Sequence, residues 1–230
     1  MSYDKDFTLD TRGGTLSLNK DTIMGENFRV NTPTFQARAL TGENKTLVVR
    51  VNTGGGAKSP PTSLSDMSNY WFGTNGDLIN NDSQFQACSF GKVSFPPYVG
   101  TTTTGVTITD GAYEITVSAT YNGSDSAIEA EARTVLEAEL GSLGQFDYVA
   151  IHVPGEGQGY CAYAYINNWF SLYQDNCGDY VTVQMHEIGH NLGLAHSGEG
   201  SSTYGDTSGV MGAMWDDNRN VCFNGAKSGA

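Results

Sequence analysis

Three of the four histidines in this 230-residue chain stand within sixteen positions, residues 181–196, which read VTVQMHEIGHNLGLAH. On an α-helix each residue advances by about 100° and 1.5 Å, so His186 and His190 lie on one face, about 6 Å apart along the axis. Both imidazoles can therefore reach a single metal ion. Glu187 lies on the flank of that face, where it can contact a molecule bound to the ion but is badly placed to be a third ligand.

The apolar residues of this segment lie on the opposite side of the same helix. Their spacing predicts a back that packs into a core, formed by Val181, Met185, Ile188 and Leu192. On a regular helix His196 would lie about 9 Å beyond His190, out of reach of the same ion. We therefore predict that the chain turns at Gly193, because glycine accepts the left-handed backbone conformation that ends a helix.

The spacing H-E-x-x-H-x-x-G-x-x-H predicts a catalytic metal site. Structural zinc sites usually have four protein ligands rich in sulfur, whereas three histidines leave one coordination position open for water. The predicted ligands are His186, His190 and His196, and Glu187 is the predicted general base. Chance coincidence is the alternative, and at ordinary residue frequencies it would produce this pattern in on the order of one chain in 10⁵.

Composition limits the size of the fold and the class of partner. With 38% hydrophobic residues, 230 residues can form one large domain or two small ones. The net charge is -13 and the twelve Lys and Arg residues are scattered, so we expect neither nucleic acid nor an acidic membrane surface as a partner.

The sequence also bears on where the protein is located. No apolar run is long enough to predict membrane insertion, and no signal peptide opens the sequence. The chain is then either cytoplasmic or a trimmed, mature form of a secreted protein, and we expect the second. Four cysteines without CxxC spacing favour two disulfides. Three pairings are possible, of which we favour Cys161 with Cys177 and Cys88 with Cys222.

Hydrophobic patterning predicts an order of elements before the histidine helix. The order is a buried strand at Thr46–Asn52, a helix with Leu64, Met67 and Trp71 on one face and Thr62 as its cap, strands at 88–95 and 112–121, a helix at Ser126–Leu140, a strand at 146–153 and an extended piece at 159–170. This order indicates an α+β, α/β-like fold with a mixed sheet. Residues 1–42 predict a short β-rich segment or prodomain remnant, and residues 43–230 the main domain.

The histidine motif resembles that of the metzincin zinc endopeptidases, which also carry a methionine in a tight turn beneath the metal. SGVMGA places Met211 fifteen residues after His196, so the resemblance gives it that role, with Met214 as second candidate. The stretches ACSFGKVSF, HEIGHNLGLAHS, YGDTSGVMG and CFNGAKS are most similar to the gametolysin family, secreted peptidases that cleave cell-wall glycoproteins. The resemblance covers roughly residues 45–228.

This resemblance implies a metzincin-type catalytic domain with a mostly parallel, twisted sheet and one catalytic Zn²⁺. It implies hydrolysis of peptide bonds in extracellular or cell-wall proteins and glycoproteins by a secreted monomer. Glu187 would take a proton from the attacking water and deliver it to the leaving amine. We expect an extended substrate to pair with a sheet edge at Tyr163, Ala164 and Tyr165, although a core strand would show the same alternation.

Several features depart from the family or stay outside its motif. The sequence stops nineteen residues after Met211, so we expect a domain truncated at its C-terminus. An inactive, metal-retaining binding module of a cell wall or matrix is therefore the alternative function.

Position 213 is Ala213, where some metzincins have an assisting tyrosine. The stretch WDDN at 215–218 could hold Ca²⁺, but a solvated loop is the preferred interpretation, and we expect His152 to be structural.

Overall fold

The computed structural model describes residues 41–156, 159–212 and 221–228. Contacts divide the chain into Met1–Gln36 and Ala37–Ala230, and all described residues belong to the second unit. The predicted N-terminal segment 1–42, except for its last two residues, lies outside the described residues, as do Met214 and the WDDN stretch.

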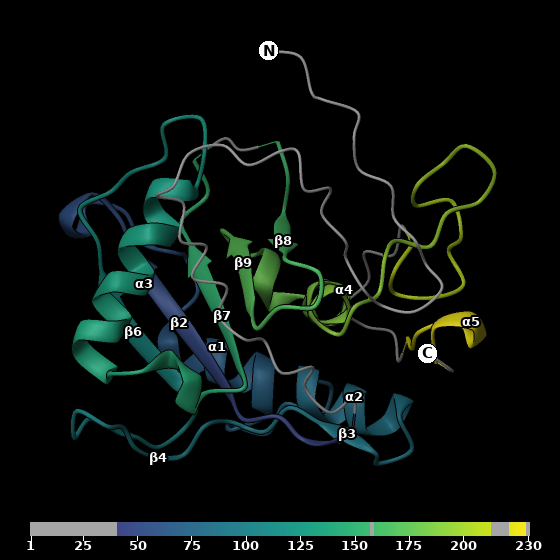
Figure 1. Cartoon of the computed structure of the whole chain (residues 1–230), viewed down its shortest axis with the longest axis horizontal. Helices are drawn as coiled ribbons and strands as arrows, with labels where there is room; N and C mark the ends of the chain where they lie inside the picture. Colours follow the sequence, from purple (N-terminus) through teal and green to yellow (C-terminus); the bar gives the residue numbers. More distant parts are fainter. Residues whose placement is uncertain (1–40, 157–158, 213–220, 229–230) are drawn as a thin grey trace, which may run out of the picture. The chain divides into compact units, whose positions relative to one another are not determined.

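A five-stranded sheet with the strand order β6-β2-β7-β9-β8 forms the centre of the unit (Figure 1). The strands are β2 (Thr46–Asn52), β6 (Ala112–Thr116), β7 (Tyr148–Val153), β8 (Ala162–Ala164) and β9 (Phe170–Gln174). The first four in the spatial order run parallel, and β8 pairs antiparallel with β9 at the outer edge. This arrangement confirms the predicted α/β-like fold with a mixed, mostly parallel sheet.

Smaller elements surround the sheet. Two-residue strands pair as β1 (Gly42–Glu43) with β3 (Val93–Ser94) and as β4 (Gly100–Thr101) with β5 (Thr107–Ile108). The α-helices are α1 (Leu64–Phe72), α2 (Asn81–Cys88), α3 (Ser126–Leu140), α4 (Val181–Asn191) and α5 (Gly225–Ser228). Short 3₁₀ turns are η1 (Gly54–Gly56), η2 (Leu143–Gln145) and η3 (Cys177–Asp179).

Helices cover the two faces of the sheet. The interior strand β2 sends Leu47, Val49 and Val51 to one face, where they pack with the apolar stripe of α3. Val48 points to the other face and packs with residues of α1, α2 and α4. A strand covered on both faces is a nearly continuous apolar run, which is why TLVVRVN predicted β2 with its observed bounds.

Two predictions near the start of the domain were wrong in detail. Residues 88–95 do not form a strand, because α2 ends there and only the two residues of β3 are extended. The sequence lacked a signal for α2 because Phe85 is its only buried apolar residue, and a reciprocal cap between Asn80 and Ser83 starts the helix instead. The cap of α1 is Ser63, whose hydroxyl accepts a hydrogen bond from the Asp66 amide, and not Thr62.

Two further strand predictions differ in extent. The strand predicted at 112–121 ends at Thr116. The extended piece predicted at 159–170 is broken after β8 by a turn in which Asn167 has a φ of 54°, and the chain then returns as β9. All five residues of β9 are buried on both faces, so FSLYQ shows no alternation that would predict a half-exposed strand.

Disulfides link Cys88 to Cys222 and Cys161 to Cys177, so the favoured pairing is confirmed. The first joins the end of α2 to the segment before α5, and the second joins the start of β8 to η3. None of the helices that the structure describes has the length and apolarity needed to span a membrane.

Candidate metal centre

Helix α4 carries the first two histidines and the glutamate. Val181, Met185 and Ile188 are at most 3% exposed and pack against the sheet, as the predicted apolar back requires. Leu192, the residue that follows the helix, is partly buried in the same cluster. Because this apolar side packs against the sheet, the side of α4 that carries His186, Glu187 and His190 is left to line a cavity.

Gly193 turns the chain after α4. Its φ is 96°, its amide donates to the His190 carbonyl over 2.9 Å, and the Leu194 amide donates to the Gly189 carbonyl over 2.9 Å. These two bonds form a Schellman motif, which ends a helix on a left-handed residue. The chain therefore turns at Gly193 in the structure.

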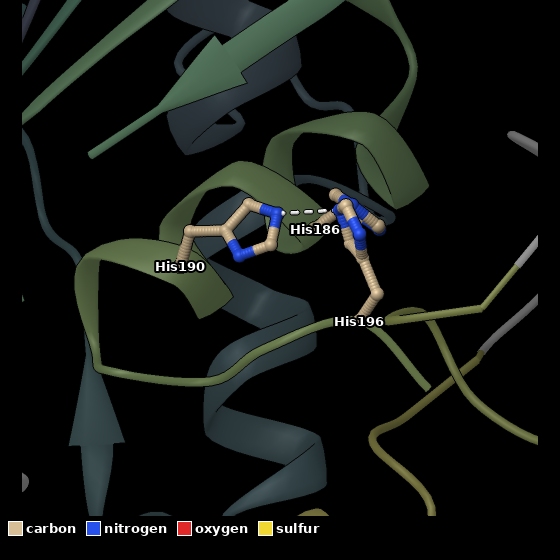
Figure 2. A group of neighbouring side chains, drawn as sticks. All are labelled: His186, His190 and His196. Carbon is tan, nitrogen blue, oxygen red and sulfur yellow. Dashed lines mark hydrogen bonds between the residues drawn. The ribbon is translucent and has the colours of Figure 1, made fainter. Parts of the chain in front are cut away.

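The turn brings His196 back to the two helical histidines. Figure 2 shows His186 and His190 on α4 and His196 on the chain that returns from it, with the three rings directed toward one another. Their ligand atoms lie within 4.8 Å of one another, and the Nε2 atoms of His190 and His196 are 3.0 Å apart. The structure therefore assembles the three residues that the sequence placed at one ion.

Backbone carbonyls orient the two helical histidines. The Nδ1 atom of His186 lies 2.6 Å from the Val210 carbonyl, and that of His190 lies 2.7 Å from the Leu194 carbonyl. A protonated Nδ1 that donates to a carbonyl leaves Nε2 unprotonated and free to bind a metal. Both rings are thus held in the tautomer that presents Nε2.

Burial also keeps the three imidazoles neutral. Loss of solvent is the main cause that lowers the pKa of His186 to about 4, and the neighbouring His190 and His196 lower it further. Loss of solvent likewise lowers the pKa of His190 and of His196, with a smaller contribution from the Lys227 ammonium. Neutral imidazoles are the form that binds a metal, so the site is ready for an ion at neutral pH.

Glu187 lies on the flank of the same helix face and is 6% exposed. Its Oε2 atom has no hydrogen-bond partner among the described residues. Burial raises the pKa of this carboxyl to about 8. A buried carboxyl oxygen without a partner is costly, which indicates that its partner is a molecule the site takes up.

These residues fit a metal ion. Three nitrogens about 2.0–2.1 Å from a tetrahedral ion lie about 3.3 Å from one another, which is compatible with the observed gathering. Three nitrogen donors leave the fourth position open, and the unpartnered oxygen of Glu187 lies beside the group. The donor set therefore matches a catalytic site better than a closed structural one.

A cavity of about 870 Å³ opens onto the histidines and Glu187. Its wall includes Tyr163 and Ala164 of β8, the strand at the outer edge of the sheet. Tyr165 does not line the cavity, and its hydroxyl instead donates to Glu129 over 2.9 Å. The structure thus places two of the three predicted edge residues beside the candidate metal site.

Tyr204 lines the same cavity and was not singled out by the sequence reasoning. It lies in the loop between His196 and Met211, and its ring centroid is 4.1 Å from that of His196. The only signal in the sequence was the tyrosine of YGDTSGVMG, a stretch that was used for resemblance alone.

Met211 lies against α4, below the histidines. It is 1% exposed, and its carbonyl accepts a hydrogen bond from the Ser197 amide over 2.8 Å. A Cβ atom at Gly189 would lie 2.5 Å from the Met211 sulfur, so the absence of a side chain there makes room for the methionine. The structure thus packs Met211 against the helix that carries His186 and His190.

His152, the fourth histidine, lies away from the cavity wall. It is fully buried on β7, where its Nε2 accepts a hydrogen bond from the Trp71 indole over 3.1 Å and its ring stacks on Tyr173. Burial lowers the pKa of His152 to about 3, so the ring stays neutral. Its contacts are those of a structural histidine.

Among solved structures, the chain is similar to OgpA from Akkermansia muciniphila, with 16% identity and a TM-score of 0.49 over 80% of this chain and 59% of that one. It is also similar to mature mirolysin from Tannerella forsythia in complex with a cleaved peptide, with 19% identity and a TM-score of 0.39 over 79% of this chain and 71% of that one. The chain thus spans about three fifths of the length of OgpA.

Comparison with curated proteins gives no match. The sequence does match the profile of the gametolysin peptidase M11 family over residues 43–229, which include all four residues of the candidate metal centre. Because this match extends over most of the chain, the protein belongs to the gametolysin peptidase M11 family.

Proposed function

We propose that the protein is a zinc-dependent endopeptidase that hydrolyses peptide bonds of extracellular or cell-wall proteins and glycoproteins. One observation carries the proposal: the nitrogens of His186, His190 and His196 meet beside the buried, unpartnered carboxyl oxygen of Glu187 at an open cavity. Residues 43–230 form the catalytic domain in this proposal, and the protein acts as a monomer.

The three histidines hold the ion. His186 and His190 are fixed by their carbonyl partners, and His196 completes the set from the loop after Gly193. When bound, a zinc ion supplies Lewis acidity, which makes a water molecule acidic near neutral pH and polarises a carbonyl. Met211 supplies an apolar floor beneath the ligands and makes no bond to the metal.

Glu187 moves the proton. Its free oxygen accepts a proton from the attacking water and then delivers that proton to the amine that leaves when the peptide bond breaks. Burial raises the pKa of this carboxyl, which strengthens it as a proton acceptor.

The edge strand β8 binds the substrate backbone. Its outer side pairs with no other strand in the described sheet, so its amide and carbonyl groups are available to an extended peptide. Ala162, Tyr163 and Ala164 of this strand all line the cavity that contains the histidines. An open cleft along a strand admits a chain that continues in both directions, which favours an endopeptidase.

A secreted location agrees with the two disulfides, which form and persist in oxidising compartments. The net charge of -13 implies an acidic surface, which favours solubility. This explanation of the charge requires no basic partner.

The test is cleavage of casein or gelatin by the purified chain, with and without a chelator, beside Glu187→Ala. We expect one zinc per chain, cleavage that stops with the chelator and returns with Zn²⁺, and a variant that binds zinc but does not cleave. Equal cleavage by wild type and variant would contradict the role of Glu187. Zinc binding without cleavage by the wild type would instead support the inactive binding module.

A further inference from the structure

The three candidate ligands differ in how the protein holds them. His186 and His190 each place Nδ1 against a backbone carbonyl, at 2.6 and 2.7 Å. Nδ1 of His196 has no hydrogen-bond partner among the described residues. The polar contact of this ring joins its Nε2 atom to Nε2 of His190, a fellow ligand. Metal-binding histidines almost always have an outer partner that fixes the ring, so His196 lacks the usual support.

An aromatic ring stands where that support is missing. The ring of Tyr204 lies 4.1 Å from the ring of His196, centroid to centroid, with an angle of 38° between the planes. The same tyrosine lies 6.1 Å from the ring of His186, nearly parallel to it. The Tyr204 hydroxyl has no hydrogen-bond partner among the described residues, so the contact is made by the ring alone.

The loop that carries Tyr204 is tied to the residue after His196. The Asp206 amide donates to the Ser197 carbonyl over 3.2 Å, and the Asp206 carboxylate accepts from the Asn224 side chain over 2.7 Å. The Ser197 amide in turn donates to the carbonyl of Met211 over 2.8 Å. The backbone that carries Tyr204 and His196 is therefore tied together within one loop, in which the two rings lie in contact.

We propose that Tyr204 is a positioning residue for His196, and that contact with its ring replaces the hydrogen bond that orients the other two histidines. This close, tilted ring contact limits the rotation of the His196 ring and keeps Nε2 directed at the other two ligand atoms. The inference rests on the proposed metal site but not on cleavage. It makes His196 the ligand whose orientation depends on a residue of the substrate cavity, since Tyr204 is 41% exposed there.

The experiment compares Tyr204→Leu with Tyr204→Phe by zinc affinity, measured in competition with a chromophoric chelator. Loss of the ring should weaken zinc binding about tenfold, the lower end of the usual effect of outer partners. The Phe variant keeps the ring and should bind within about twofold of wild type. Tyr113→Leu on β6, at the opposite edge of the sheet, is the matched control and should also bind like wild type.

A second readout separates orientation from general damage. The visible spectrum of the Co²⁺-loaded protein reports ligand geometry, and it should change in Tyr204→Leu and stay the same in Tyr204→Phe. In a His196→Ala background the added Tyr204→Leu change should weaken zinc binding no further, because its target is gone. A loss of binding caused by poor folding would persist in this double variant and would appear as additivity, which distinguishes it from a loss of His196 orientation.

Three results would overturn the inference while leaving the zinc site standing. These are wild-type affinity in Tyr204→Leu, equal loss in the Leu and Phe variants, and full additivity with His196→Ala. A wild-type chain that binds no zinc would instead reject the proposed function itself. The two failures are therefore distinguishable in the same set of measurements.

Discussion

The two faces of the sheet are built from different residues. Beneath α3 the buried side chains are almost all aliphatic, with α3 contributing Ile128, Ala132, Leu136 and Leu140 in a single stripe. On the α4 face, the cluster contains methionines and the aromatic rings of Trp71 and Tyr173. The sheet is thus covered by an almost entirely aliphatic cluster on one face and by a cluster with methionine and aromatic side chains on the other.

Buried polar groups sharpen this difference. Among the described residues, the buried side-chain atoms without hydrogen-bond partners belong to α2, α4, η3 or the strands β7 and β9, and to no residue of α3 or β6. Four of them are in α4, at Thr182, Gln184, Glu187 and Asn191. Such groups cost stability, so the α4 face should stabilise the fold less than the α3 face does. One of the four, Glu187, lines the cavity at the candidate metal centre.

Among the changes considered, Glu187→Gln on the α4 face should produce the largest effect. It should lower the rate of cleavage without lowering stability. The amide keeps the shape of the side chain but cannot accept the proton, so kcat/KM should fall about 10²- to 10⁴-fold. Zinc affinity and the free energy of unfolding should not decrease, because no buried charge partner is removed. Peptide cleavage and urea unfolding measure the two quantities, and a large loss of stability would contradict the division between the faces.

Leu136→Ala is the matching change on the α3 face. Leu136 is fully buried in the aliphatic stripe, so the cavity should lower the free energy of unfolding by about 2–5 kcal/mol. Urea unfolding in the presence of a chelator measures this loss without a contribution from bound zinc. Cleavage per folded molecule should stay near wild type at low temperature. A variant that is stable but inactive would show that the faces are not separable.

Removal of the disulfide between Cys88 and Cys222 should affect both stability and the metal site. The bond closes a separation of 134 residues, so the double serine variant should lose about 2–5 kcal/mol in unfolding. It also anchors the segment in which Lys227 donates to the Ala195 carbonyl over 2.9 Å, next to His196. Zinc affinity should therefore fall as well. The matched control removes the Cys161–Cys177 bond, whose shorter separation of 16 residues should give a smaller loss of stability.

The sequence predicted the α4 face best where spacing and chemistry act together. The structure brings His186, His190 and His196 together and turns the chain at Gly193. Helix geometry decides where residues four apart lie and which residue can turn the chain. The same reasoning missed Tyr204, which reaches His196 through a loop whose path no periodicity describes.

On the opposite face, α3 was predicted with its observed bounds, since an amphipathic stripe ending at Gly141 is a local signal. Helix α2 and strand β9 were missed for opposite reasons. The first has little apolar patterning, and the second is buried on both faces and so has no alternation. Both depend on neighbours that are distant in sequence, which a local pattern cannot contain.

Acid should destabilise the metal-free protein through His152. Burial lowers the pKa of this ring from 6.5 to about 3, so between these values the unfolded chain binds a proton that the folded chain does not. Stability is then present above pH 6.5 and falls as the pH drops, by about 1.4 kcal/mol per pH unit for this residue. Urea unfolding from pH 7 to pH 5 with a chelator should show a shallower slope in His152→Gln. Identical slopes would contradict the assignment to His152.

The smallest effect is expected from Gly193→Ala, which tests the turn between helix α4 and the loop that carries His196. A left-handed backbone at a φ of 96° costs about 1–2 kcal/mol for alanine, and its Cβ atom would lie 2.5 Å from Oδ1 of Asn167. Because the turn sets the position of His196, zinc affinity should fall more than the stability of the metal-free protein does. Gly200→Ala, also left-handed but with no atom within 4 Å of the added Cβ atom, is the control for backbone strain alone. If both variants bind zinc equally well, the turn at Gly193 ends the helix without governing the third ligand.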